Sequence, residues 1–268
     1  MDAIRSLLPG GSSYYLLCAV VLVVAYLVNT TYITVFYHRG LAHGAVTLKP
    51  WLRRFVAVTG SWVTGIDPKA WACMHRQHHT YSDTAKDPHS PLNSNVFAVM
   101  LDQLRSYERI LVQLLKGRPD TTAIVADLDF PVSWVNRKRV WYLPYVAQIA
   151  IAIALGVFTG GWLLGACYFF GLMSHPIEGW LVNSFAHAFG YRNFETEDNS
   201  RNNTLIAWLV MGEGYQNNHH AHPGSAKFAF RRFELDLGYV VCLVLKGLGL
   251  IEIPRYDAAP KRVPAQSY

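Results

Sequence analysis

The stretch YYLLCAVVLVVAYLVNTTYITVFY, from Tyr14 to Tyr37, decides the fold class of this chain. It carries no charged residue and exceeds the roughly 20 apolar residues that cross a bilayer as a helix. Two further apolar segments, 140–158 and 162–187, are separated only by a short glycine-rich turn, which predicts an antiparallel helical hairpin. The sequence therefore predicts an all-α integral membrane protein with three transmembrane helices, or four at most.

The composition supports a membrane protein rather than a soluble enzyme. Of the 268 residues, 51% are hydrophobic and only 16% are charged, whereas soluble domains usually contain about 25% charged residues. This balance excludes a disordered chain and a disulfide scaffold. The four cysteines are far apart and form no C-x-x-C pair, so we interpret them as small buried hydrophobic residues.

The positive charges are distributed unevenly along the chain. Residues 1–37 contain one Lys or Arg, residues 38–139 contain 14, residues 140–187 contain none, and nine follow. Cytoplasmic segments of membrane proteins are enriched in Lys and Arg, so we expect residues 38–139 and the segment after 187 on the cytoplasmic side and the N-terminus outside. The protein is expected to be an integral membrane protein of a bacterial inner membrane. A single domain, 1–268, would then comprise spans 14–37, 140–158 and 162–187 and a cytoplasmic helical cap from 38–139 and 188–268. The net charge of +6 needs no nucleic acid to explain it, and no nucleic-acid motif is present.

Shorter segments of the cap have their own patterns. The apolar stretches Phe55–Ile66 and Leu237–Ile251 are too short to span a bilayer and are predicted to lie along its interface. Residues 93–115 are predicted to form a helix, and residues 117–136 a polar connector.

Eight of the 11 histidines occur in four clusters, at or beyond the cytoplasmic edge. The clusters are H-x-x-x-x-H (His38 and His43), H-x-x-H-H (His75, His78 and His79), N-x-x-x-H (Asn183 and His187) and Q-x-x-H-H (Gln216, His219 and His220). Positions i, i+3 and i+4 share one face of an α-helix, so the last three clusters each point one way. His38 and His43 would lie about 140° apart on an α-helix, which indicates a fraying helix end or two separate metals.

So many imidazoles predict two metal ions rather than one. Ligation by nitrogen and amide groups without thiolate is compatible with Fe, Zn or Cu and argues against structural zinc. The remaining histidines, His89, His175 and His222, are predicted to form hydrogen bonds, caps or loops. A non-catalytic metal-binding or transport protein is the alternative from another class, but transporters usually show inverted repeats and midplane ligands, and this sequence shows neither.

Four segments resemble the signature regions of the membrane-bound fatty acyl desaturases of the stearoyl-CoA Δ9 type. These are HRGLAH (38–43), HRQHHTYSDTAKDPHS (75–90), WLVNSFAHAFGYRN (180–193) and GEGYQNNHHAHP (212–223), in the same order over roughly residues 32–223. The resemblance implies two iron ions, O2 as co-substrate, electrons from an external carrier such as ferredoxin, rubredoxin or cytochrome b5, and insertion of a cis double bond into a fatty acyl chain. It implies no catalytic residue beyond the metal ligands, which would be His38, His43, His75, His78, His79, His187, His219 and His220, with Asn183 in a weak or water-mediated position.

Three departures from the family pattern matter. Gln216 replaces the histidine that usually opens the last cluster, so one iron would be more open or ligated through the amide. Cys73 and Met74 stand where acyl-CoA desaturases commonly have an Arg-Asp pair, which leaves acyl-CoA, acyl carrier protein and lipid-esterified chains as possible substrates. The family's first membrane helix has no counterpart, which is consistent with an N-terminus outside.

The resemblance also suggests roles around the irons. We expect an apolar tunnel between the first and third spans, lined by Trp71 and Trp180, to position the acyl chain. Nearby carboxylates are candidates for hydrogen bonds to the free N–H groups of the ligands; they are Asp83, Asp87, Asp198 and Glu213. A fatty acyl hydroxylase or acetylenase of the same superfamily is the alternative within enzymes.

Overall fold

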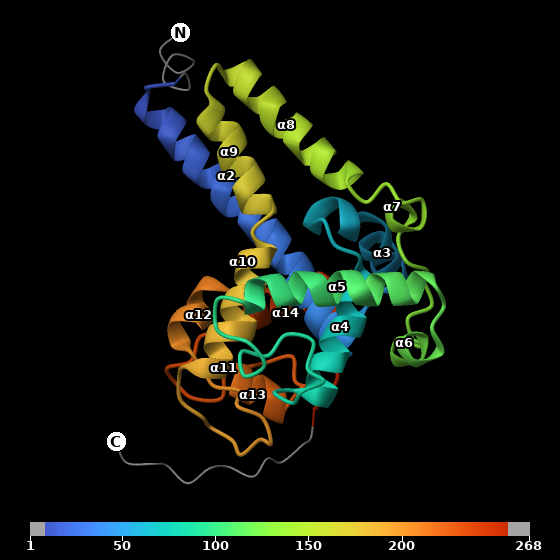
Figure 1. Ribbon diagram of the computed structural model, residues 1–268. Helices are drawn as coiled ribbons and strands as arrows, with labels where there is room; N and C mark the ends of the chain where they lie inside the picture. The colour runs from blue at the N-terminus through green and yellow to red at the C-terminus, as the bar shows by residue number, and fades with distance from the viewer. Residues whose placement is uncertain (1–8, 257–268) are drawn as a thin grey trace.

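The computed structural model describes residues 9–256, whose regular elements are almost all helices. In chain order the elements are α2 (Ser12–Thr31), η1 (Tyr32–Ala42), β1 (Thr47–Leu48), α3 (Pro50–Thr64), α4 (Pro68–Tyr81), α5 (Val99–Leu115), α6 (Pro119–Ile124), α7 (Trp134–Arg137), α8 (Leu143–Thr159), α9 (Trp162–Leu172), α10 (His175–Trp180), η2 (Leu181–Phe185), α11 (Ala186–Ala188), α12 (Thr204–Leu209), α13 (Gln216–Ala221), α14 (Leu237–Gly247) and β2 (Ile251–Glu252). Figure 1 shows an elongated arm of α2, α8 and α9, and a rounded lobe that holds the other elements. We call these parts the hairpin arm and the cap. The predominance of helices is confirmed, and the exception is the short antiparallel pair of β1 and β2.

The segment predicted as the first span forms part of a longer helix. α2 and η1 form one continuous helix of 31 residues, Ser12–Ala42, which is about 46 Å long at 1.5 Å per residue. Among residues 9–256, it is the one helix long and apolar enough to cross a membrane. Its length exceeds the bilayer core of about 30 Å, so its last turns continue into the cap.

The other two predicted spans are shorter than expected. Segment 140–158 corresponds to α8, which has 17 residues, and the helix that begins segment 162–187 is α9, which has only 11. The prediction of one continuous helix over 162–187 is wrong, because α9 ends at Leu172 and the chain restarts as α10, η2 and α11. Pro176 explains the break, since it lacks a backbone N–H and fits only the first turn of a new helix. The structure therefore does not confirm three spans.

Close helix contacts hold the hairpin arm together. α9 lies between α2 and α8 (Figure 1), and Gly160 closes the turn between α8 and α9 at a positive φ of 67°. A Cβ added to Gly171 would lie 2.6 Å from the backbone oxygen of Leu22, so α9 approaches α2 at van der Waals distance. The Nδ2 atom of Asn29 donates to the carbonyl of Leu172 at 2.6 Å, which fixes the lower end of this contact.

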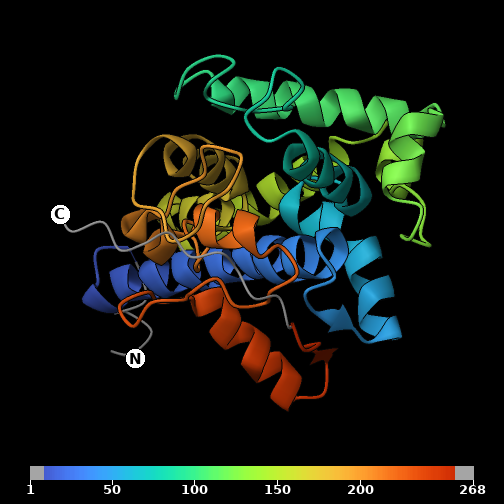
Figure 2. The same cartoon turned by 90° about the horizontal axis from the view of Figure 1, so that it is seen from below.

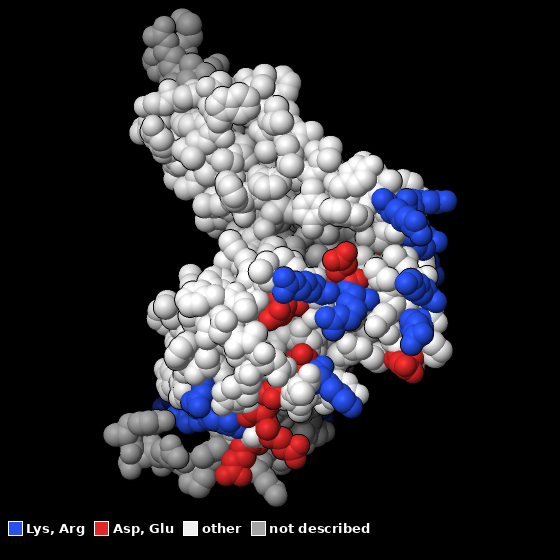
Figure 3. Space-filling model, in the orientation of Figure 1, with Lys and Arg blue, Asp and Glu red and all other residues white. Residues whose placement is uncertain are grey.

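The outer surface of the hairpin arm is apolar. Large side chains such as Leu16, Val157, Phe158 and Phe170 are exposed on it. In the view of Figure 3 no Lys, Arg, Asp or Glu is visible on the upper part of the molecule, whereas charged residues gather on the right side and at the lower end of the cap. Exposed apolar surface of this extent is typical of contact with lipid rather than water. The arm therefore fits a membrane.

The cap is built around the end of the long helix. Figure 2 shows the α2–η1 helix passing through the middle of the molecule, with α4 and α13 near its far end. Val35, Tyr37 and Leu41 of η1 pack with residues of α3 and α4 in the main hydrophobic core. The helix predicted over 93–115 is confirmed as α5, but the connector predicted over 117–136 contains the short helices α6 and α7. The two predicted interfacial stretches form α3 and α14.

We expect Gly171→Val to lower the thermal stability of the protein in detergent. The added side chain would collide with backbone of α2, so the free energy of unfolding should fall by about 1–3 kcal/mol. The matched control is Gly247→Ala in α14, where a new Cβ meets no atom within 4 Å. Equal melting temperatures for the two variants would contradict the close α2–α9 contact.

Candidate metal centre

The π-helical turn of η1 brings His38 and His43 to the same side. The backbone N–H of His43 donates to the carbonyl of His38 at 3.1 Å, which is the i→i+5 bond that defines a π-helix. Residues five apart are therefore one turn apart, and the two ring centroids lie 5.0 Å from each other. The expectation that these rings diverge by about 140° is wrong, because it assumed α-helical geometry.

Five imidazoles from three elements form the first group of rings. We call this set the five-imidazole group; its members are His38, His43, His75, His79 and His219, and one ring nitrogen of each lies within 4.8 Å of the others. The Nε2 atom of His219 lies 2.9 Å from Nε2 of His38 and 2.9 Å from Nε2 of His79. The Nε2 atoms of His43 and His75 are 2.8 Å apart. η1, α4 and α13 thus direct their imidazoles to one point.

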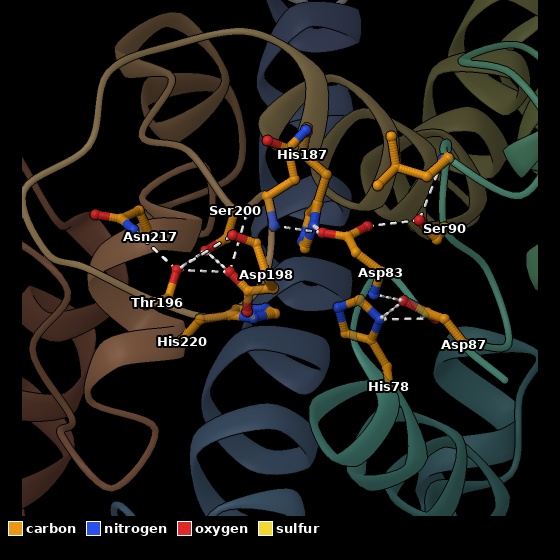
Figure 4. A network of polar contacts seen from close by, with 12 residues as sticks. His78, Asp83, Asp87, Ser90, His187, Thr196, Asp198, Ser200, Asn217 and His220 are labelled. Carbon is orange, nitrogen blue, oxygen red and sulfur yellow. Dashed lines mark hydrogen bonds and ion pairs between the residues drawn. The ribbon is translucent and has the colours of Figure 1, made fainter. Parts of the chain in front are cut away.

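A second group of three rings lies beside the first. The three-imidazole group consists of His78 from α4, His187 from α11 and His220 from α13, again within 4.8 Å of one another. Figure 4 shows these rings facing a common space, with their other sides turned toward carboxylates. Within residues 9–256 the Nε2 atoms of all three are buried and have no hydrogen-bond partner. A buried nitrogen without a partner is costly, so this space fits an electrophile such as a metal ion.

Each member of the three-imidazole group is held by a carboxylate at its Nδ1 atom. His78 pairs with Asp87 at 3.0 Å and His187 with Asp83 at 3.1 Å, and His220 pairs with Asp198 at 2.5 Å. These contacts are drawn as dashed lines in Figure 4. A carboxylate that accepts from Nδ1–H fixes the ring orientation and leaves the Nε2 lone pair for a metal.

In the five-imidazole group, Glu213 plays the same part for His38, at 2.6 Å from Nδ1. The four carboxylates predicted to contact the ligands are thereby confirmed as their hydrogen-bond partners. Glu213 is itself anchored by Arg39, which is fully buried and also contacts Asp236 at 3.0 Å.

Burial keeps the imidazoles uncharged. It lowers the pKa of four members of the five-imidazole group well below the ordinary value of 6.5, and repulsion between neighbouring rings lowers it further; they are His43, His75, His79 and His219. Burial also lowers the pKa of His220, to about 4, although its bond to Asp198 opposes the shift. Neutral imidazole is the form that binds metals.

The paired carboxylates remain ionised for the opposite reason. Burial alone would raise the pKa of Asp83, Asp87 and Asp198, but hydrogen bonds from their histidine partners outweigh it and lower each pKa below the ordinary value. The pKa of Glu213 is lowered too, because its contacts with His38 and Arg39 outweigh its burial. The arrangement therefore combines neutral ligands with negative partners, which suits a bound cation.

A cavity adjoins the five-imidazole group and is lined by His38, His75, Trp71, Asn183 and Gln216. Trp71 stacks on His75 with a centroid distance of 5.0 Å, as expected of a tunnel wall. Trp180 does not line this cavity. Its ring packs near Phe97 and its Nε1 atom donates to the carbonyl of Val96, so the prediction of Trp180 as a lining residue does not match the cavity.

The amides and the other histidines differ partly from expectation. The Nε2 atom of Gln216 donates to the carbonyl of Glu213 at 2.8 Å, and Asn183 contacts Gln103. His89 was expected to hydrogen-bond, but among the described residues neither ring nitrogen has a partner. It lines the cavity and stacks on His78 at 4.7 Å. The sequence feature that could have indicated this position is the motif D-P-H-S, in which His89 follows Asp87 by two residues. Asp87 is the carboxylate that holds His78.

Comparison with known proteins identifies the family. A model of the fatty acid desaturase family matches residues 13–235. The chain is 30% identical over 242 residues to Delta-9 acyl-lipid desaturase 1 of Arabidopsis thaliana, a match that covers 86% of this chain and 72% of the relative. It is 33% identical over 220 residues to the sn-1 stearoyl-lipid 9-desaturase of Anabaena variabilis, with 81% and 76% covered.

A third relative has a different named activity. The chain is 30% identical over 230 residues to the hex-5-enoyl-(acyl-carrier protein) acetylenase of Moorena producens, with 80% of this chain and 69% of the relative covered. The histidine groups, the matched family model and these relatives agree. The chain belongs to the fatty acid desaturase family, is an oxidoreductase, and within the family resembles the Δ9 desaturases.

Proposed function

We propose that this protein is an O2-dependent di-iron desaturase that inserts a cis double bond into a fatty acyl chain. The observation that carries the proposal is the pair of imidazole groups that converge inside the cap, beside a cavity whose lining reaches the hairpin arm only at Thr30. In the proposed reaction two hydrogens leave adjacent carbons of the chain. Together with one O2, two electrons and two protons, this yields the alkene and two waters.

Each imidazole group would hold one metal ion. The eight histidines of the two groups are the proposed ligands, and Asn183 and Gln216 are additional candidates on the cavity side. Donors limited to nitrogen and amide oxygen suit a redox-active ion such as iron. Two bound irons would supply, with O2, the oxidising power to break an unactivated C–H bond, which side-chain acids and bases lack.

The protein's own residues would orient the ligands and the substrate. Asp83, Asp87, Asp198 and Glu213 each hold one imidazole ring through Nδ1, which keeps the Nε2 atoms of these four rings directed inward. Trp71, stacked on His75, forms a rigid apolar wall where the acyl chain would pass. Positioning of the chain decides which two carbons face the metals.

The acyl carrier remains one of three: coenzyme A, acyl carrier protein or a membrane lipid. Met74 lines the cavity and Cys73 is fully buried, so this position offers no charge to a carrier. Electrons would come from ferredoxin, rubredoxin or cytochrome b5. We place the N-terminus outside and the cap in the cytoplasm, because the cap carries nearly all Lys and Arg.

An acetylenase is the second candidate, because one relative carries that name. An acetylenase removes two hydrogens from an existing double bond, whereas a hydroxylase adds one oxygen to the chain. Mass spectrometry of the cellular fatty acids, with saturated and unsaturated chains supplied separately, distinguishes the three activities.

The principal test replaces one ligand from each group. We expect His219→Ala and His187→Ala each to lower the iron content from two ions per chain and to abolish the unsaturated product. His222→Gln is the control, because His222 belongs to neither group. Full iron content and unchanged double-bond content in both ligand variants would remove the assignment.

Asp83→Asn tests the carboxylates separately from the ligands. Asp83 has a positive φ of 58°, which asparagine tolerates, so the backbone should be kept. Loss of the charge on the His187 partner should weaken iron binding about 10–100-fold. The control Asp102→Asn removes a partly exposed carboxylate beside Arg105. Equal iron affinity in both variants would show that Asp83 does not tune the site.

The metal-free protein should lose stability on mild acidification. In the folded protein the pKa values of His43, His75, His79, His219 and His220 lie below 6.5, the ordinary value that applies to the unfolded chain. Below pH 6.5 the unfolded chain therefore binds more protons than the folded one. Stability should therefore be full above pH 6.5 and fall as the pH drops toward about 4. Melting temperatures of chelator-treated protein check this, and His219→Ala should show a shallower decline. A flat profile in the parent protein would contradict the buried neutral state.

A further inference from the structure

Glu178, in the cavity wall, has no part in the proposed mechanism. Its side chain is buried, with 5% of the residue exposed. Oε1 accepts hydrogen bonds from Thr30 at 3.2 Å and from Ser174 at 2.5 Å. Among residues 9–256, Oε2 has no hydrogen-bond partner. A buried carboxyl oxygen without a partner costs free energy, so its presence in a substrate cavity calls for an explanation.

The part of the cavity near Glu178 is a closed end. One face of the long helix lines the cavity; its residues are Thr30, Ile33, Thr34 and His38. Thr30 is the first lining residue along the chain and lies eight residues, or about two helical turns, before His38. Immediately beyond it, α9 packs against α2 through Gly171, and Asn29 bonds to Leu172. Among the described residues none of α9 lines the cavity, so the cavity ends at this contact between α2 and α9.

A closed end can accept only the free terminus of an acyl chain. Coenzyme A, acyl carrier protein and a lipid headgroup are all too large and polar to pass between α2 and α9. On the side of the cap, α5 closes against α10, where Gln103 donates to the carbonyl of Pro176 at 2.8 Å. The carrier therefore belongs at the other part of the cavity, and the chain terminus belongs beside Thr30 and Glu178.

This end of the cavity is polar. His175 lies one helical turn before Glu178 in α10 and lines the same cavity, and within the described residues its buried Nδ1 atom also has no partner. A methyl terminus would leave both groups without a hydrogen bond. A terminal hydroxyl could donate to Glu178 Oε2 and accept from the imidazole or the carboxyl group, since a hydroxyl has both capacities.

We propose that Glu178, together with His175, forms a polar end of the acyl cavity that selects chains with a hydrogen-bonding terminal group, such as an ω-hydroxyl, over chains that end in methyl. The inference rests on the proposed function, because it assumes that the cavity holds the acyl substrate. It concerns only recognition of the terminus and adds no chemical step.

The test compares two substrates in three proteins. Cells that express the parent protein, Glu178→Leu or Glu178→Gln are supplied with ω-hydroxy and unsubstituted fatty acids of equal length, over a series of lengths. We expect the parent and Glu178→Gln to prefer the ω-hydroxy chain, because glutamine keeps the size and the hydrogen-bonding capacity. Glu178→Leu keeps the size alone, so its preference should fall at least about tenfold, the value of one hydrogen bond, and turnover of methyl-ended chains should rise.

A binding measurement keeps the proposal testable if Glu178→Leu does not fold. The thermal shift of the purified parent protein should be larger with the ω-hydroxy fatty acid than with its unsubstituted counterpart, and Thr30→Val, which removes one donor to Glu178, should reduce the difference. An unchanged substrate ratio in Glu178→Leu, or equal shifts in the parent, would overturn the proposal. Desaturation of methyl-ended chains in that outcome would leave the proposed function standing, whereas no desaturation of either substrate would count against the function itself.

Discussion

Eight imidazole rings share one buried volume, and the rest of the structure depends on how their lone pairs are satisfied. Burial lowers the pKa of five of these rings, so they cannot be stabilised as imidazolium ions; they are His43, His75, His79, His219 and His220. The Nε2 atoms of the first group lie 2.8–2.9 Å apart in pairs, and those of the second group have no partner among the described residues. Neutral nitrogens directed at one point are a ligand set, and the ionised carboxylates behind them supply the compensating negative charge. Protonation, orientation and burial thus all favour a bound cation.

The fold delivers these rings from elements that are far apart in the sequence. The π-helical end of the long helix turns His38 and His43 to one side. The buried ion pairs of Arg39 fix that end against Glu213, just before α13, and Asp236, which caps α14. The break in the helix after α9 likewise reorients side chains toward the site. By ending the apolar helix at Leu172, it lets η2 and α11 present Asn183 and His187 from a new direction. Irregular helices are therefore concentrated at the site, where regular ones would point the side chains elsewhere.

These irregularities also mark the limit of what the sequence could reveal. Histidines at i, i+3 and i+4 were informative because α4 and α13 are ordinary helices, and their proximity to acidic residues correctly suggested the carboxylate partners. The five-residue spacing of His38 and His43 was misleading, because nothing in the local pattern distinguishes a π-helix from an α-helix. Hydropathy suggested one long third span, because apolar residues predominate in 162–187 on both sides of the polar stretch around Pro176. Trp180 was wrongly predicted to line the acyl cavity. The residue type indicates that a ring is buried, but it does not indicate which interior surface the ring faces.

Gln216 shows how one substitution can make the two groups unequal. It begins α13, one turn before His219, where its Nε2 atom is committed to the carbonyl of Glu213. Gln216 lines the cavity together with His38 and His75. On that side its amide oxygen is the atom that can act as a ligand. On the proposed assignment, this position of the five-imidazole group offers a neutral oxygen, which binds more weakly than the imidazole usual in the family. The weakest ligand of the metal centre would thus face the acyl chain, on the side from which O2 and substrate would both approach. The three-imidazole group is held through its carboxylates on the opposite side.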